Sequence, residues 1–157
     1  MKPYEVFASR FGSRVAFNPE LVFEKNQRYY LLNRTLKNEL QVNYYYAGLY
    51  LGKVKSDRFF PSFNLLNMLV SAAANKIVVD QKAAWLFICG RDIFRTGIIK
   101  VMGSKRNGDA TLILNEFGEC LGFGKILDDL VESNGKVAVK NVLDVGDFLR
   151  REVREKF

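Results

Sequence analysis

The residues with the clearest chemical use are four cations near the C-terminal end of the chain. Arg154 follows Arg150 by four residues and Arg151 by three, a spacing that places the three side chains on one face of a helix. Lys156 adds a fourth positive charge close by. Cations on one face neutralise the phosphates of a nucleic acid and release its counterions. This group, the C-terminal cations, is therefore a candidate for contact with the phosphates of a nucleic acid.

A second group of cations lies earlier in the same half of the chain. Within it Asp92 is the one opposing charge, so most of the positive charge is uncompensated. The same phosphate chemistry makes this group a second candidate for contact with a nucleic acid. Its members are Arg91, Arg95, Lys100, Lys105 and Arg106.

The C-terminal cations also have a purely structural interpretation, which stays open. On a helix, Glu152 can pair with Lys156 and Arg151 with Glu155, each four residues apart. Exposed pairs of this kind contribute about 0.3–0.5 kcal/mol each. The group is then a solvated helix face that binds no ligand.

The sequence lacks the usual side chains of catalysis and metal binding. It has no histidine, which removes Ser-His-Asp and Cys-His nucleophiles and imidazole metal sites. Cys89 and Cys120 are too far apart for a CxxC motif, and we interpret both as reduced thiols in the core. Residues 103–105 lack the order of a phosphate-binding loop, and the acidic pair at 128–129 has no nucleophilic partner. We expect no enzyme activity, cofactor, metal or small-molecule substrate.

The composition is that of a folded protein, and its net charge favours a polyanionic partner. Its 157 residues suffice for one ordinary domain or two small ones, and 48% of them are hydrophobic. Lys and Arg number 24 against 17 Asp and Glu, a net charge of +7. Such an excess favours nucleic acid, ahead of acidic membrane or protein surfaces. No apolar stretch reaches about 18 residues, so we expect a cytoplasmic location and no membrane association.

The elements expected before residue 80 form an α/β unit. Tyr4 begins a helical pattern that Gly12 ends, and Asn33 is a suitable N-cap for a second helix. Two β-rich runs separated by 25–27 predict a hairpin, and an aromatic run interrupted by glycines predicts a twisted strand. The expected helices cover 4–11, 33–40 and 61–74, and the expected strands cover 21–24, 28–32, 44–54 and 59–60.

Short strands with regular turn signals dominate the rest of the chain. Glycines such as Gly103, Gly118 and Gly124 recur between β-rich runs, as in a small β-barrel. We therefore predict one domain over 1–80 and a second over 81–157. Strands are expected at 77–79, 84–88, 98–101, 111–114, 121–126 and 137–139, with a short helix at 91–95 and a terminal helix at 144–156 whose apolar stripe is Val145, Phe148, Leu149 and Val153.

Aromatic side chains are numerous, and stacking with unpaired bases is one use for them. A strand at 44–46 sends alternate tyrosine rings to opposite faces, so we expect one set to lie in the core. Core packing is also the favoured interpretation for Trp85 and for the pair at 59–60. The tyrosines at 29–30 stay undecided.

Landmarks in the second half occur in an order that resembles the PUA domain, an RNA-binding pseudo-barrel named after pseudouridine synthases and archaeosine transglycosylases. The resemblance implies that the C-terminal cations contact RNA, with Arg150 and Arg151 aligned to the motif. It also implies that the bare backbone of Gly97 lets a ribose-phosphate chain approach, although a tight turn would equally require glycine. The landmarks are Trp85, Arg95-Thr96-Gly97-Ile98, Leu121-Gly122-Phe123-Gly124 and Val145-Gly146-Asp147-Phe148.

The first half resembles the N-terminal domain of the Nip-seven family of ribosome-biogenesis factors. The likeness rests on Leu51-Gly52-Lys53, on Phe59-Phe60-Pro61 and on the helix that leads toward Trp85. The compact first half fits an archaeal-type homologue. The implied fold class is α+β: an N-terminal α/β pre-PUA domain with a mainly antiparallel sheet, followed by a C-terminal PUA pseudo-β-barrel.

The resemblance implies a non-catalytic RNA-binding factor in ribosome biogenesis, acting in pre-rRNA processing and assembly of the large subunit. The expected partners are pre-ribosomal RNA, single-stranded or structured and including uridine-rich RNA, and assembly or RNA-processing proteins that dock on the N-terminal domain. Two alternatives stay open. One is a protein-interaction adaptor whose charge serves solubility, and the other is an accessory subunit that lends its PUA domain to a separate RNA-modifying enzyme.

Overall fold

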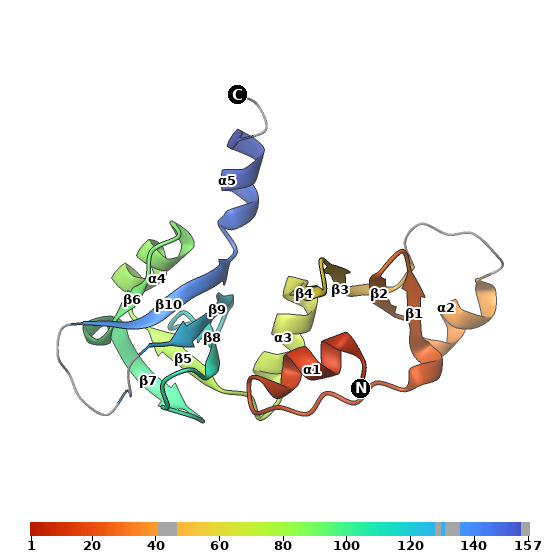
Figure 1. Ribbon diagram of the computed structural model, residues 1–157, viewed down its shortest axis with the longest axis horizontal. Helices are drawn as coiled ribbons and strands as arrows, with labels where there is room; N and C mark the ends of the chain where they lie inside the picture. The colour runs from red at the N-terminus through yellow and green to blue at the C-terminus, as the bar shows by residue number, and fades with distance from the viewer. Residues whose placement is uncertain (41–46, 128–129, 131–135, 155–157) are drawn as a thin grey trace.

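The N-terminal half is built around a four-stranded antiparallel sheet in the order β1-β2-β3-β4 (Figure 1). The computed structural model describes residues 1–40, 47–127, 130 and 136–154. Residue pairs with positive φ, Asn26-Gln27 and Ser56-Asp57, form the turns of the two tight hairpins. The elements are α1 (Pro3–Ser9), η1 (Pro19–Leu21), β1 (Val22–Lys25), β2 (Arg28–Leu31), α2 (Arg34–Glu39), β3 (Leu49–Lys55), β4 (Arg58–Pro61) and α3 (Phe63–Ser71).

The C-terminal half is a six-stranded sheet in the order β6-β10-β9-β8-β5-β7. The pair β5–β8 is parallel, and the other pairs are antiparallel. The sheet curls into a half-barrel that fits a PUA-like fold, which confirms the α+β fold class. Its elements are β5 (Lys76–Val79), α4 (Gln81–Ile88), β6 (Ile93–Phe94), η2 (Arg95–Gly97), β7 (Ile98–Met102), β8 (Ala110–Leu114), β9 (Cys120–Ile126), β10 (Val137–Asp144) and α5 (Asp147–Arg154).

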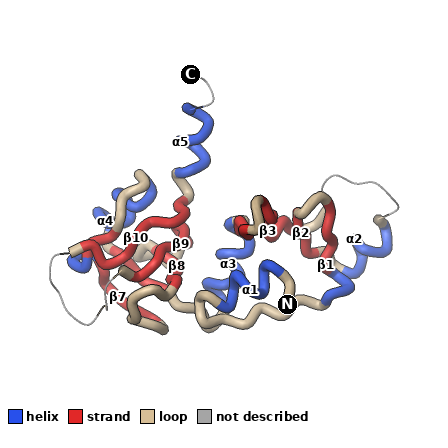
Figure 2. Tube along the Cα trace, in the orientation of Figure 1, coloured by secondary structure: helices blue, strands red, loops and turns tan. Residues whose placement is uncertain are grey.

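The second sheet packs on both of its faces. On its inner face, Phe87 of α4 lies in a buried cluster with Val139. On its outer face, the ring of Phe123 meets the rings of Phe7 and Phe11 edge-on, with centroids 5.4 and 5.6 Å apart. Helices α1 and α3 therefore lie between the two sheets (Figure 2). The two halves of the chain share one apolar interior.

A buried asparagine joins the two halves beside this interior. The Asn75 N–H donates to the Phe11 carbonyl at 2.8 Å, and its Nδ2 donates to the Ala110 carbonyl at 3.2 Å. Its Oδ1 accepts from the Ser104 N–H at 2.9 Å. The end of α1, the loop between β7 and β8, and the start of β8 are thereby fixed to one another.

The prediction of a buried strand at 84–88 is wrong, because these residues belong to α4. Asp80 caps this helix by accepting the Ala83 N–H at 2.7 Å. A short apolar run is compatible with a buried strand and with a helix that buries one face. Here the Asp80 cap and the burial of only one face of the run show that it is a helix. Of the side chains in the run, Phe87 is fully buried, whereas Trp85 is 64% exposed. The prediction that Trp85 packs in the core is therefore also wrong.

Three further predictions need correction. The helix at 91–95 is absent, since this segment holds β6 and the start of η2. Pro61 ends β4 rather than opening a helix, and Ser62 caps α3 by accepting the Leu65 N–H at 3.2 Å. Cys89 is exposed and so is not a core thiol.

The domain boundary at residue 80 stays a prediction, but the structure shows to which sheet the strand before it belongs. Strand β5 lies between β8 and β7 in the second sheet. Any division of the chain that separates β5 from residues 81 onward would remove an interior strand of that sheet. The first sheet, in contrast, ends at β4.

The remaining elements lie where the sequence predicts them, with ends shifted by a few residues. Asn33 caps α2, and the undecided tyrosines, Tyr29 and Tyr30, are both buried. Residues 44–46 lie outside the described part of the chain. Leu149 of the terminal helix is 70% exposed and Val145 just before it is 44% exposed, so these two members of the apolar stripe are not buried against the body. None of the helices in the described ranges is long and apolar enough to cross a membrane.

Candidate nucleic-acid interface

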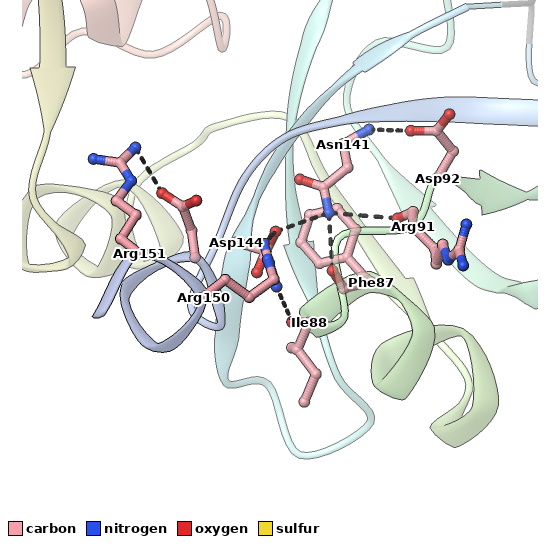
Figure 3. Close-up of polar contacts among 9 residues, drawn as sticks. Phe87, Ile88, Arg91, Asp92, Asn141, Asp144, Arg150 and Arg151 are labelled. Atoms are coloured by element: carbon pink, nitrogen blue, oxygen red, sulfur yellow. Dashed lines mark hydrogen bonds and ion pairs between the residues drawn. The ribbon is translucent and has the colours of Figure 1, made fainter. Parts of the chain in front are cut away.

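The structure places Arg150 where α5 meets the C-terminal end of α4 (Figure 3). Its Nη1 donates to the Ile88 carbonyl at 2.6 Å, and its Nη2 pairs with Asp144 Oδ2 at 2.7 Å. The Asp144 side chain is 3% exposed, and that of Arg150 is 35% exposed. The hydrogen bond that the Arg150 guanidinium donates to Asp144 raises the pKa of Arg150 above its ordinary value. Arg150 is therefore an anchor for α5, and its contact with RNA stays a prediction.

Asn141 extends this anchor to the loop after α4. Its Nδ2 donates to the Phe87 carbonyl at 2.8 Å and to Asp144 Oδ2 at 3.1 Å. Its backbone N–H donates to Asp92 Oδ1 at 2.8 Å. The end of α4, the segment at 91–92, the end of β10 and the start of α5 thus form one hydrogen-bonded unit, which we call the α4–α5 junction.

Two glycines allow the close approach of backbone at this junction. A Cβ on Gly146 would lie 2.0 Å from the Ile88 carbonyl oxygen, and a Cβ on Gly90 would lie 3.3 Å from the Arg150 guanidinium. Gly90 also has a φ of +87°, which favours glycine. The sequence analysis included Gly146 among its landmarks but missed Asn141 and Asp144. Apart from the hydrogen bond between these two residues, their partners come from α4, from the loop after it and from α5, so no sequence spacing identifies them.

The exposed cations of the junction are Arg151 and Arg91. The Arg151 side chain is 63% exposed and pairs with Asp147, one helical turn earlier, at 2.7 Å. Arg91 is exposed and points away from the hydrogen-bonded unit (Figure 3). Arg154 ends α5, and Lys156 lies outside the described residues. The junction thus carries Arg150 and Arg151 of the C-terminal cations and Arg91 of the second group, and the side chains of Arg151 and Arg91 extend from opposite sides of it (Figure 3).

The rest of the second group is distributed over other elements. Lys100 is exposed on β7, and Lys105 and Arg106 are exposed in the loop that follows it. Arg106 pairs with Asp109 at 3.5 Å. Arg95 is half-buried in η2. These cations thus lie on η2, on β7 and in the loop after it, outside the hydrogen-bonded unit of the junction.

Gly97, the predicted point of RNA approach, is buried. A Cβ at this position would lie 2.6 Å from the Ala83 Cβ, and the Gly97 carbonyl accepts the Asp80 N–H at 2.9 Å. The residue is needed for close packing of η2 against α4. Its role in RNA contact stays a prediction, and packing alone accounts for the glycine.

A cleft of about 530 Å³ separates α4 from the hairpin of β8 and β9. Trp85 lies on its α4 side, and the exposed Lys82 is one helical turn before it. The sequence analysis missed this site because it assigned Trp85 to a buried strand. The signal available in the sequence was Asp80, a suitable N-cap residue directly before the run. The lining residues are Gln81, Lys82, Ala84, Trp85, Ile88, Asn115 and Leu121.

One acid and one thiol near the α4 cleft have structural roles or surroundings. The Glu119 carboxylate accepts from the Asn115 amide at 2.6 Å within the β8–β9 turn. Burial raises the pKa of the Cys120 thiol to about 11, so this thiol is protonated at neutral pH. Residues 128–129 are not among those described.

Comparisons with known proteins agree with this fold. Residues 75–153 match the UPF0113 PUA domain family. A UPF0113 protein of Archaeoglobus fulgidus is 30% identical over 118 residues, which cover 71% of this chain and 66% of that protein. A conserved PUA domain protein from Thermoplasma acidophilum superimposes with a TM-score of 0.61 at 20% identity, covering 94% of this chain and 90% of its own. A PUA domain from Aeropyrum pernix gives 0.60 at 18% identity, covering 95% and 85%.

Proposed function

The chain belongs to the UPF0113 PUA domain family, and from this premise we propose that it is a non-catalytic factor that holds RNA at the α4–α5 junction. PUA domains commonly bind RNA, and the net charge of +7 suits a phosphate-rich partner. The observation that carries the proposal is the anchored junction itself. The pair between Arg150 and the buried Asp144 fixes the backbone from which Arg151 and Arg91 extend. Because this backbone is fixed, binding of a phosphate orders only the arginine side chains.

The ion pair between Arg151 and Asp147 is compatible with this use. An exposed pair within a helix is worth about 0.3–0.5 kcal/mol, so an RNA phosphate can replace the carboxylate at small cost. A guanidinium also binds phosphate through two parallel hydrogen bonds. RNA binding would therefore release Arg151 from Asp147.

Trp85, which also lies on α4, supplies a surface on which an unpaired base can stack. Its ring is 64% exposed beside the α4 cleft, with Lys82 close enough to meet a flanking phosphate. Stacking of a base on an aromatic ring is worth about 1–3 kcal/mol and tolerates any base. The arrangement supports single-stranded RNA as the ligand, with little dependence on sequence.

We further propose that the RNA is pre-ribosomal and that residues 1–80 dock assembly or RNA-processing proteins. Support comes from the resemblance of the first half to the Nip-seven family and from the presence of an α/β unit before the PUA half. The rings of Tyr4, Phe7, Phe11 and Tyr29 are buried in the shared core. A docking surface would therefore use exposed side chains such as Phe60 and Leu49.

The proposal is tested by RNA binding measured by fluorescence anisotropy at several salt concentrations. We expect the wild-type chain to bind a uridine-rich single strand more tightly than duplex DNA, and its affinity to fall steeply with salt. The double variant Arg91→Ala/Arg151→Ala should bind at least tenfold more weakly, with a salt slope reduced by about 1.4 for two lost phosphate contacts.

The matched control is Arg34→Ala/Arg58→Ala, which removes the same charge from exposed positions in the first half. Its RNA affinity should stay within about threefold of wild type, because long-range charge effects are screened. Equal losses in both variants would show that net charge, not the junction, determines binding. Absence of RNA binding at low salt would favour the protein-interaction adaptor instead.

A further inference from the structure

Two exposed lysines lie directly opposite each other in the second sheet. Lys125 of β9 and Lys140 of β10 are cross-strand partners, with their side chains on the same face. The Cβ atoms of such partners lie about 4.5–5.5 Å apart, and like charges in this arrangement destabilise a sheet. The third position in the row, on β8, is occupied by the uncharged Ala110.

Within the part of the chain that the structure describes, neighbouring acids do not compensate the two charges. None of the ion pairs among the described residues includes Lys125 or Lys140. Asp92 accepts a hydrogen bond from the Asn141 backbone, and Asp109 pairs with Arg106 and hydrogen-bonds to Ser104 Oγ. The two ammonium groups therefore repel each other on rigid strands. An external anion that binds between them would offset this repulsion.

The lysine pair lies on the opposite face of the sheet from the α4–α5 junction. Asn141 reaches Phe87 of α4 on the inner face, so the preceding side chain, Lys140, points to the outer face. On β9, Phe123 precedes Lys125 by two residues and contacts α1 on that same outer face. The lysines therefore stand at the rim of the contact between the two halves of the chain.

Further cations border the same rim. Asn75 joins Ala110, the neighbour of Lys125, to the carbonyl of Phe11 and to the loop after β7. The exposed Arg10 directly precedes Phe11, and the exposed Lys105 lies in that loop. Both halves of the chain therefore contribute cations to the surroundings of the pair.

We propose that Lys125 and Lys140 form a second phosphate-binding site, which holds the backbone of an RNA strand on the outer face of the sheet. The inference rests on the proposed RNA binding and extends it to a site that only longer RNA reaches. A strand confined to the α4–α5 junction does not contact it. Recognition is through phosphate charge and is independent of base sequence.

The test compares the double variant Lys125→Gln/Lys140→Gln with wild type on RNAs of about 4 and about 16 nucleotides, the range of single-strand site sizes. We expect the affinity for the longer RNA to fall about tenfold and its salt slope to fall by about 1.4. The affinity for the short RNA should be unchanged. Thermal stability should be equal or higher, since the repulsion is removed. The control is Lys53→Gln/Lys55→Gln, which neutralises two exposed lysines on β3.

The outcomes separate this inference from the proposed function. One outcome is that Lys125→Gln/Lys140→Gln binds both RNAs as tightly as wild type, whereas Arg91→Ala/Arg151→Ala loses binding. This outcome would overturn the second site and leave the first. An equal loss in the β3 control, or a lower melting temperature of the lysine variant, would also overturn it. Failure of the wild-type chain to bind either RNA at low salt would overturn both.

Discussion

Arg150 and Arg151 are adjacent and identical in type, yet their side chains have different surroundings. Arg150 faces a buried carboxylate and the end of α4, whereas Arg151 faces solvent and a neighbour on its own helix. Helical spacing places both on the candidate RNA face and cannot distinguish them. The difference arises from Asp144 and Ile88, which belong to other elements. At the residue scale, the sequence thus predicts which cations lie close together but not which of them supports the fold.

Replacing each arginine separately should reveal this difference. Arg150→Ala leaves the Asp144 carboxylate buried without its cation, and we expect a loss of about 2 kcal/mol after allowing for partial solvent exposure. Arg151→Ala should change the free energy of unfolding by less than about 0.5 kcal/mol. Urea unfolding of both variants measures the difference. Equal stability of the two variants would contradict the anchoring role of Arg150.

The two thiols should also differ in reactivity. Cys89 is exposed, whereas burial raises the pKa of Cys120 to about 11. Because thiolate is the reactive form, maleimide at about pH 8 should label Cys89 well before Cys120 in the folded protein. Digestion and mass spectrometry after timed labelling give the two rates. Similar rates would mean that Cys120 is not enclosed as described.

At the element scale, α4 shows what the sequence can predict and what it leaves ambiguous. Its apolar run satisfies the pattern of a buried strand as well as that of a helix buried along one face. The decisive contact, Asp80 capping the Ala83 N–H, is local and was visible as a suitable cap residue. The hairpin of β1 and β2 and the cap of α2 were predictable because turn and cap residues there agree with the apolar pattern.

Two glycine substitutions test how the strands of the second sheet pack. Gly122 has a φ of +144°, and a Cβ there would lie 1.9 Å from the Leu143 carbonyl oxygen on β10. We expect Gly122→Val to prevent folding of the chain. Gly118, with a φ of +80° and open space around it, is the matched control, and Gly118→Ala should cost about 1 kcal/mol. Circular dichroism melts compare them, and a stably folded Gly122→Val variant would contradict the β9–β10 register.

At the scale of the whole molecule, the two halves depend on each other. Phe123 of the second sheet packs against Phe7 and Phe11, and Asn75 bonds to both halves. The sequence predicted two regions, because helices and strands alternate before residue 80, whereas short strands separated by turn residues dominate after it. It did not predict the shared interior, since contacts between distant aromatic residues leave no periodic pattern.

This dependence predicts the behaviour of the isolated second half. A fragment of residues 81–157 lacks β5, which lies between β8 and β7, and exposes the outer face that includes Leu112 and Phe123. We expect this fragment not to fold alone. Chemical-shift dispersion in its proton NMR spectrum is the measurement, with the full chain as reference. A well-dispersed, cooperatively melting fragment would show that the boundary at 80 separates two independent domains.

The most direct test of RNA binding at the α4–α5 junction uses Trp85 itself, which is the single tryptophan of the chain and is 64% exposed. Titration of the wild-type protein with single-stranded RNA should quench its fluorescence saturably, since a stacked base alters the indole environment. The quenching should weaken with salt and largely disappear in Arg91→Ala/Arg151→Ala. Binding detected by anisotropy with no change in tryptophan fluorescence would place the RNA elsewhere and contradict the account.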